Sequence, residues 1–343
     1  MTQIAVTVLT GFLGAGKTTL LRHILHESHG YKIAVIENEF GEVPVDDQLI
    51  GDQATQLRTL SNGCICCTRS GELEETLLDL LARLDCGEAE FDRLIIECTG
   101  MADPGPIVQA FFAHETLCER YLLDGVITLV DAVHAEQQLD KFTVAQSQVG
   151  YADRLLVTKT DVAGESSQLI ARLQRINARA PVCPVINGRI DLALLFNTRG
   201  FMLEENVVPA GQRFHFISQQ QNEVSSVVVG LDYPVVLEEV SAVMEKLLVS
   251  FADNLLRYKG MLWIAGDARR LLFQGVQRLY SADWDREWQA DESPQSQLVF
   301  IGIQLPEQEI RQAFEGLRKG QDAALTAPGF SSAVSDNDGC PAQ

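Results

Sequence analysis

Near its N-terminus the chain reads Gly11-Phe-Leu-Gly-Ala-Gly16-Lys17-Thr18-Thr19, directly after the apolar run Ile4–Leu9. This stretch fits the pattern G-x-x-x-x-G-K-[ST], in which a strand leads into a glycine-rich loop and then into a helix. Glycines let successive backbone N–H groups converge on an anion, and the following helix adds the partial positive charge of its N-terminus. The sequence therefore predicts a nucleotide-phosphate site built into an α/β fold.

The residues of this loop have separate expected roles. Lys17 should reach the β- and γ-phosphates, and the Thr18 hydroxyl should bind Mg²⁺. Thr19 is expected to hydrogen-bond the α-phosphate. Backbone groups complete the predicted cradle at Gly11, Gly14, Ala15 and Gly16.

A carboxylate, Glu97, ends the buried run Leu-Ile-Ile, and Gly100 follows closely. In folds of this kind such a carboxylate lies beside the Mg²⁺, and the reach of a Glu favours a contact through water. Glu97 therefore joins Lys17 and Thr18 as a predicted catalytic residue. Gly100 is expected to let the backbone approach the γ-phosphate, which makes Gly100–Asp103 a candidate switch segment. Because no Gln follows Gly100 to orient the attacking water, slow turnover is expected, on the order of 10⁻³–10⁻² s⁻¹ or below.

A second motif, Thr158-Lys159-Thr160-Asp161, follows another apolar run. The Asp161 carboxylate can accept hydrogen bonds from N1–H and N2–H₂ of guanine, a pair that adenine does not offer. Sites that depend on such polar pairing discriminate strongly, because the wrong base leaves the carboxylate unpaired. The stem of Lys159 can lie along the base plane. Thr158 stands where the usual N-K-x-D pattern has Asn, and the combined motifs favour GTP over ATP.

Length and charge limit the remaining possibilities. The chain has 343 residues, enough for two domains, and a formal net charge of −20. Such acidity repels phosphate backbones and anionic lipid heads, which argues against nucleic acid or membranes as main partners. No apolar run reaches the roughly 20 residues of a membrane span, and the N-terminus lacks a basic signal-peptide region. We expect a cytoplasmic protein.

The cysteines cluster in an unusual way. The chain has eight, and three of them lie in Cys64-Ile-Cys66-Cys67. In an intracellular protein this clustering indicates metal or redox chemistry. Two thiolates from so short a loop can hold a borderline ion, but a tetrahedral site needs further ligands. Glu37 and Glu42, which follow the second predicted strand, are candidates, and the set suits Zn²⁺, Co²⁺ or Ni²⁺. Buried structural cysteines with solvated acids remain the alternative.

Other side chains could supplement such a site. Glu74 lies about two turns past Cys67, and His114 follows the helix after Glu97. Either could complete a ligand set, although a lone His is more often structural. His23, His26 and His29 are spaced for one helix; they could capture a metal ion, but the expectation is that they only face solvent.

The coarse pattern predicts a doubly wound, mostly parallel α/β domain in residues 1–205, because apolar runs alternate with helical patterns. A smaller α+β domain is expected over residues 206–319, and a disordered tail over 320–343. The first domain's predicted strands are Ile4–Leu9, Lys32–Ile36, Arg93–Ile96, Gly125–Val130, Leu155–Thr158 and Val182–Ile186. Its predicted helices are Thr18–Glu27, Glu72–Leu84, Pro106–Phe112, Val133–Gln138 and Ser166–Ala178. The second domain is expected to contain strands Arg213–Ile217, Val224–Leu231, Leu256–Ile264, Arg270–Leu279 and Gln297–Ile303, with helices Leu237–Val249 and Pro306–Leu317.

Together these motifs resemble the CobW-type metal-handling GTPases, relatives of the nickel and cobalamin maturation factors. The resemblance rests on Gly11–Thr19, Glu37–Glu42, Gly63–Cys67, Glu97–Gly100 and Thr158–Asp161, and it extends over nearly the whole chain outside the tail. It implies a GTPase domain, a smaller C-terminal domain, weak GTP hydrolysis and binding of Zn²⁺ or another transition metal. The leading hypothesis is a GTP-dependent metal chaperone or insertase that serves a client metalloprotein. Self-association stays open.

Two other classes of function compete with this hypothesis. In one, the chain is a switch that grips a client protein according to its GTP state, and the cysteines are structural. In the other, it is a small-molecule kinase, against which Thr158–Asp161 argues. A thiol-redox role is remote, because C-x-C-C is not C-x-x-C.

Overall fold

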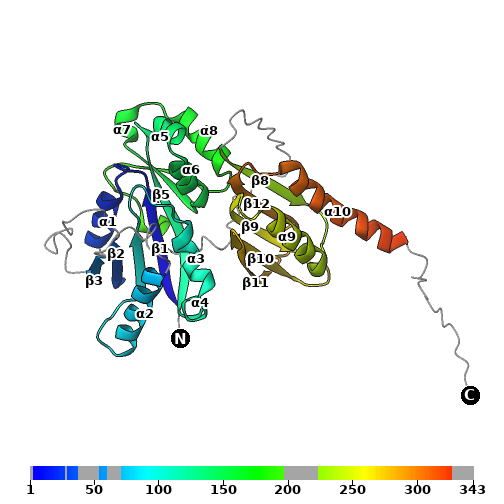
Figure 1. Ribbon diagram of the computed structural model, residues 1–343, viewed down its shortest axis with the longest axis horizontal. Coiled ribbons are helices and arrows are strands. Elements are labelled where there is room, and N and C mark those ends of the chain that lie inside the picture. The colour runs from blue at the N-terminus through cyan, green and yellow to red at the C-terminus, as the bar shows by residue number, and fades with distance from the viewer. Residues whose placement is uncertain (1–2, 28, 38–53, 60–70, 197–222, 327–343) are drawn as a thin grey trace, which may run out of the picture.

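The computed structural model describes residues 3–27, 29–37, 54–59, 71–196 and 223–326, and Figure 1 shows two domains side by side. The elements of the N-terminal domain are, in chain order, β1 (Ile4–Gly11), α1 (Lys17–His26), β2 (Ile33–Glu37), β3 (Ala54–Thr59), α2 (Gly71–Asp85), β4 (Arg93–Glu97), α3 (Gly105–Ala113), α4 (Glu115–Arg120), β5 (Tyr121–Asp131), α5 (Ala135–Lys141), α6 (Thr143–Tyr151), β6 (Arg154–Thr158), α7 (Thr160–Ala163), α8 (Ser167–Ile176), β7 (Val182–Val185) and the 3₁₀ helix η2 (Leu192–Leu194).

Within the described residues, the strands of this domain form a seven-stranded sheet in the order β3-β2-β4-β1-β5-β6-β7. Every neighbouring pair is parallel. The carboxyl ends of all the strands therefore lie at one edge of the sheet. The predicted doubly wound α/β class is confirmed.

Both faces of this sheet are covered, which explains the continuous apolar runs in the sequence. Successive residues of a strand point to opposite faces. In β4, Ile95 packs with the apolar side chains of α1, whereas Leu94 and Ile96 pack with those of α2 and α3 on the other face. On α2 the apolar residues are spaced three and four apart, so a single side of that helix is buried: Leu73, Leu77, Leu80 and Leu81.

The C-terminal domain is an antiparallel sheet with two helices. Its elements are β8 (Val224–Leu231), α9 (Leu237–Phe251), β9 (Leu255–Trp263), β10 (Arg269–Val276), β11 (Leu279–Glu287), β12 (Ser296–Ile303) and α10 (Glu307–Thr326). The sheet order is β11-β10-β9-β12-β8. Side chains of α9 and α10 share a core with one face of the sheet. Side chains on its other face, including Val224 and Ile301, join the core of the N-terminal domain. The expected α+β arrangement is confirmed.

Some expectations fall outside the described residues, and one is corrected. The predicted strand Arg213–Ile217 and the boundary at 205/206 lie outside the described ranges. The last helix was expected to end at Leu317, with disorder from residue 320, but α10 continues to Thr326. Its final residues, Gln321-Asp-Ala-Ala-Leu325, include strong helix formers, so the helix propagates beyond its last predicted apolar contact. The rest of the predicted tail, 327–343, lies outside the description.

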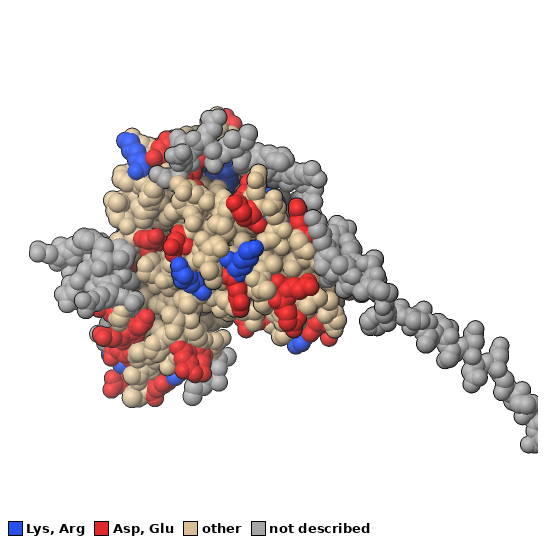
Figure 2. All heavy atoms as spheres, turned by 45° about the vertical axis from the view of Figure 1, so that its right-hand side comes forward, with Lys and Arg blue, Asp and Glu red and all other residues tan. Residues whose placement is uncertain are grey.

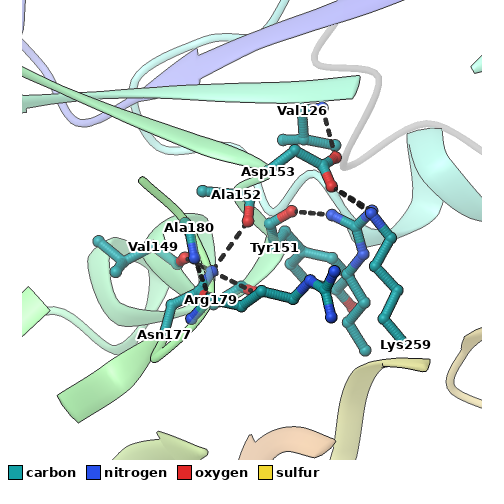
Figure 3. Close-up of polar contacts among 11 residues, drawn as sticks. Val126, Val149, Tyr151, Ala152, Asp153, Asn177, Arg179, Ala180 and Lys259 are labelled. Atoms are coloured by element: carbon teal, nitrogen blue, oxygen red, sulfur yellow. Dashed lines mark hydrogen bonds and ion pairs between the residues drawn. The ribbon is translucent and has the colours of Figure 1, made fainter. Parts of the chain in front are cut away.

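The two domains meet at a buried carboxylate, Asp153, at the start of β6 (Figure 3). One oxygen, Oδ1, accepts hydrogen bonds from Arg257 and from Lys259, each at 2.8 Å, and Oδ2 accepts one from the backbone N–H of Val126 at 2.9 Å. Burial would raise the pKa of Asp153, but attraction by Arg257 and Lys259 outweighs burial and lowers it. Arg179 lies beside the same group (Figure 3), so three basic side chains surround one carboxylate.

Lys259→Met should flatten the pH dependence of stability. Burial lowers the pKa of Lys259 from 10.5 to about 7, against the attraction of Asp153. Between these two values the unfolded chain binds one proton more than the folded chain, so stability rises with pH in this window. From pH 7 to about pH 8.5, the wild type should gain on the order of 1–2 kcal/mol relative to Lys259→Met.

Urea unfolding at each pH under reducing conditions measures this difference. The exposed Lys246 in α9 provides the control, because Lys246→Met removes a lysine that is not buried. Identical pH dependence in the wild type and the Lys259→Met variant would contradict the account.

The surface reflects the acidic composition. Figure 2 shows Asp and Glu side chains spread over both domains on one face, with fewer Lys and Arg. None of the helices in the described ranges combines the length and the apolar character that crossing a bilayer requires.

Candidate functional site

The glycine-rich loop lies at the carboxyl edge of the sheet, between β1 and α1. Gly14 and Gly16 have φ values of +77° and +97°, in the left-handed region that favours glycine. At Gly11 a Cβ would lie 2.4 Å from the carbonyl oxygen of Leu129, so only glycine fits against the neighbouring strand. The first turn of α1 contains no acidic residue. No carboxylate of this turn therefore opposes an anion at the N-terminus of α1, where the sequence predicts the phosphates to bind.

Lys17 is folded into this loop. Its Nζ donates hydrogen bonds to the carbonyl oxygens of Gly11 at 2.9 Å and Phe12 at 3.4 Å. Burial lowers the pKa of Lys17, and attraction by Glu97 opposes this effect. The ammonium group is thus held at the mouth of the cradle in which phosphates are expected.

Thr18 and Glu97 meet, as the prediction of a shared magnesium site requires. The Thr18 hydroxyl donates a hydrogen bond of 3.1 Å to Oε1 of Glu97. Glu97 is the last residue of β4 and is buried, and its backbone pairs with Leu9 of β1. Hydroxyl and carboxylate oxygens are ligands that Mg²⁺ prefers, so this donor pair fits the ion.

The segment after β4 crosses the glycine-rich loop. A Cβ at Gly100 would lie 2.7 Å from the backbone nitrogen of Leu13 and 2.8 Å from its Cα. Gly100 is therefore required by the close approach of Leu13. Its expected approach to a γ-phosphate stays a prediction.

The predicted guanine-reading motif joins the same loop. The Thr158 hydroxyl donates a hydrogen bond of 2.9 Å to the carbonyl oxygen of Ala15. Thr158 thus ties β6 to the phosphate cradle, although the usual pattern has Asn here. Asp161 is exposed in the first turn of α7. On the other side, a Cβ at Gly188 would lie 3.0 Å from the carbonyl oxygen of Thr19, so the loop after β7 also reaches α1.

Sequence reasoning missed Asp131, which positions Lys159. Asp131 is buried at the end of β5, and its Oδ2 accepts hydrogen bonds from Lys159 Nζ at 2.7 Å and from His134 at 2.9 Å. Burial would raise the pKa of Asp131, but these bonds and the N–H of Val133 lower it. Lys159 itself has a φ of +57°. The sequence did offer a signal for Asp131: like Glu97, it is a carboxylate at the end of a buried apolar run.

Most of the predicted metal ligands lie outside the description. These are Glu42, Cys64, Cys66, Cys67 and the side chain of Glu37, whose backbone ends β2. Glu74 is half-buried in the first turn of α2, and His114 lies between α3 and α4. Among the residues that the structure describes, no three His, Cys, Asp or Glu side chains gather as a metal site. Ligation by Glu74 and His114 therefore stays a prediction.

One of the candidate histidines does not fit its expected place. Helix α1 ends at His26, so His29 lies in the following loop and not on the helix. His29 is half-buried, stacked on Tyr31, and burial lowers its pKa. The expectation that His29 only faces solvent is wrong, because the aromatic rings of Tyr31 and Phe196 pack around it.

Comparisons with known proteins agree with this geometry. The family model "CobW/HypB/UreG, nucleotide-binding domain" matches residues 5–184, and the model "Cobalamin synthesis protein cobW C-terminal domain" matches residues 224–318. The chain is 74% identical to the zinc chaperone YjiA of Escherichia coli (strain K12), over 93% of this chain and 100% of that protein. It is 33% identical to the zinc chaperone CobW of Pseudomonas aeruginosa, over 90% of each.

The fold also matches a solved structure. The crystal structure of the Zn(II)-bound E37A,C66A,C67A triple mutant of the YjiA GTPase gives a TM-score of 0.77 at 69% sequence identity. The match covers 92% of this chain and 99% of that one. The resemblance inferred from the sequence motifs is confirmed. The chain belongs to the CobW/HypB/UreG family of P-loop GTPases.

Proposed function

We propose that this protein is a GTP-dependent zinc chaperone that couples its nucleotide state to the binding and release of the metal. The observation that carries the proposal is the register of four strands at one edge of the sheet. Leu9 pairs with Glu97, Glu97 with Glu37, and Glu37 with Thr59. The phosphate loop, the Mg²⁺ carboxylate and the start of both metal-binding candidate segments therefore emerge side by side.

Covalent geometry limits how far Cys64 can lie from this edge. Cys64 follows Thr59, the last residue of β3, by five positions. A fully extended chain covers at most about 3.6 Å per residue, so the Cα of Cys64 lies within about 18 Å of Thr59. Thr59 is two strands, about 10 Å, from Glu97. The cysteine loop therefore has the reach to meet Glu37 beside the nucleotide.

The donor set fits zinc. Glu37, Cys66 and Cys67 are the residue types changed in the YjiA triple mutant, and this chain carries the same types at the same numbers. Thiolate and carboxylate ligands together suit Zn²⁺, and Co²⁺ or Ni²⁺ bind similar sets. Glu42 and Cys64 are further candidates for the same ion. The relatives named zinc chaperones favour zinc as the cargo.

In the proposed cycle, bound GTP orders the segments Glu37–Glu42 and Gly100–Asp103. Thr18 and Glu97 would hold a Mg²⁺ ion, which would supply positive charge to the phosphates. Lys17 stabilises charge on the transferred phosphoryl group. Ordering of Glu37–Glu42 changes the geometry around the thiolates, and hydrolysis releases the segments. The zinc then passes to a client metalloprotein in the cytoplasm.

The GTPase activity of the isolated protein should be slow. Directly after Gly100 the chain has Met101 and not a glutamine that could orient the attacking water, and unassisted GTPases turn over on the order of 10⁻³–10⁻² s⁻¹ or below. Phosphate release at saturating GTP measures the rate, and zinc analysis of the purified protein by mass spectrometry accompanies it. Rapid turnover together with a zinc-free protein would contradict the proposed function.

Asp161→Asn should alter base selection. A carboxylate accepts from N1–H and N2–H₂ of guanine, whereas an amide presents an N–H donor that suits the 2-carbonyl of xanthine. We expect the affinity for GTP to fall by at least about 10-fold, because a mismatched polar pair weakens binding. The affinity for xanthosine triphosphate should rise, because the new N–H donor matches its 2-carbonyl oxygen. Displacement of a fluorescent GTP analogue by GTP, ATP or xanthosine triphosphate tests this. The exposed Asp232 provides the control, Asp232→Asn. Equal displacement by ATP and GTP in the wild type would show that the motif does not read guanine.

A further inference from the structure

Helix α6 is a buried element that carries polar side chains. Every residue from Ala145 to Tyr151 is buried. They include Gln146, at 6% exposure, and Gln148, at 1%. An amide removed from water destabilises the fold unless its hydrogen bonds are replaced. The hydrogen bonds of these two glutamines therefore show which segments the helix connects.

Gln148 holds the candidate switch segment. Its Nε2 donates hydrogen bonds to the carbonyl oxygens of Gly100 at 3.2 Å and of Ala102 at 2.9 Å. Gly100 is also the residue that packs against Leu13 of the phosphate loop. A change in the backbone of this segment would break or move both bonds from Gln148.

The same helix holds the first strand of the C-terminal domain. Oε1 of Gln146 accepts a hydrogen bond of 2.9 Å from the backbone N–H of Val224, where β8 begins. At Gly150, a Cβ would lie 3.2 Å from side-chain atoms of both Val224 and Ile301. The helix and the C-terminal sheet are therefore closely packed, and a displacement of α6 would move β8.

The end of α6 repeats this double contact. A Cβ at Gly105, the first residue of α3, would lie 2.5 Å from the hydroxyl oxygen of Tyr151. The carbonyl oxygen of Tyr151 accepts a hydrogen bond from Arg257 of β9. Farther along α3, Gln109 donates a hydrogen bond of 2.7 Å to Gln277, which follows β10. The segment that follows Glu97 thus contacts the C-terminal domain both through α6 and through α3.

We propose that α6 transmits the conformation of Gly100–Asp103 to β8 of the C-terminal domain, and that Gln148 is the positioning residue at the nucleotide end. The inference rests on the proposed function, in which Gly100–Asp103 responds to the nucleotide. Bound GTP then changes the positions of the carbonyl groups to which Gln148 is hydrogen-bonded. As a result α6 shifts, and the hydrogen bond between Gln146 and Val224 moves the start of β8. The C-terminal sheet consequently differs between the GTP and GDP states.

Hydrogen–deuterium exchange of the full-length protein tests this transmission. Peptides covering residues 100–103 and 224–231 are compared with Mg²⁺ and either GDP or a non-hydrolysable GTP analogue. Both segments should change protection in the wild type. A response at 100–103 without one at 224–231 overturns the inference and leaves the proposed function standing. No response in either segment overturns both.

Gln148→Leu separates positioning from folding. Leucine has similar size but donates no hydrogen bond, so the change at 224–231 should disappear while GTP affinity stays within about 3-fold of the wild type. The kcat for GTP should fall roughly 10-fold with little change in KM, because the switch segment is misplaced. Gln274→Leu, at a half-buried glutamine of β10, is the matched control and should keep both responses. Gln148→Asn, whose amide is too short to reach both carbonyls, serves as the second variant. An unchanged response at 224–231 in either Gln148 variant overturns the inference.

Discussion

Lys17→Ala should reduce GTP hydrolysis by roughly 100- to 1,000-fold, the effect of removing one preorganised charge-stabilising donor. Lys17 is buried in the glycine-rich loop, and its Nζ already lies 2.9 Å from the carbonyl oxygen of Gly11. An alanine leaves the backbone cradle but removes the cation that balances the phosphoryl charge. Phosphate release under single-turnover conditions measures the loss.

The matched control for this variant is Lys246→Ala, at an exposed lysine on α9 of the other domain. Its hydrolysis rate should equal that of the wild type. Thermal unfolding shows whether Lys17→Ala remains folded. A folded Lys17→Ala variant that hydrolyses GTP within a few-fold of the wild type would remove Lys17 from the catalytic set.

The Cys66→Ser/Cys67→Ser variant should bind zinc at least about 100-fold more weakly. Loss of a partner that only orients a metal ligand costs about 10- to 100-fold in affinity, and loss of a thiolate ligand should cost more. Competition with a chromophoric chelator measures the affinity.

Cys86→Ser provides the control, since Cys86 is exposed just after α2 and is not part of the cysteine cluster. This variant should bind zinc as the wild type does. If the Cys66→Ser/Cys67→Ser variant retained the wild-type zinc affinity, the cysteines would be structural. The GTP-dependent interaction switch would then become the better description of the protein.

The convergence of Lys17, Thr18 and Glu97 was predictable because each residue stands in a local sequence pattern. Glycines before Lys17 identify a turn, and a carboxylate after three buried apolar residues identifies Glu97 as a strand end. The carboxyl ends of parallel strands lie at one edge of the sheet, so these residues were expected to lie close together. The contact of 3.1 Å between Thr18 and Glu97 follows from this arrangement.

Other elements could not be predicted because their patterns depend on tertiary contacts. Helix α6 contains Gln146-Ser147-Gln148 in a fully buried position and therefore shows no amphipathic period. Its two glutamines are hydrogen-bonded to Leu139, Val224 and the switch segment, none of which is visible in the local sequence. Likewise, β3 reads Ala-Thr-Gln-Leu-Arg-Thr and lacks the apolar run of a central strand.

The sequence-based prediction of β10 and β11 was wrong for a different reason. The predicted strand Arg270–Leu279 ran through the turn, which the register places between Val276 and Leu279. Gln277 occupies that turn with a φ of +51°, where Asn or Gly is usual. Without that signal, the charged and largely exposed β11 could not be recognised as a partner strand.

Zinc affinity measured with and without nucleotide tests the central claim most directly. The protein is titrated with Zn²⁺ against a chelator in the presence of Mg²⁺ and a non-hydrolysable GTP analogue, Mg²⁺ and GDP, or Mg²⁺ alone. Coupling between two sites is typically 1–3 kcal/mol, so the zinc Kd should differ by roughly 5- to 150-fold between the GTP-analogue and GDP states. By linkage, zinc should change the affinity for the GTP analogue by the same factor. Equal zinc affinities in all three conditions would contradict the account.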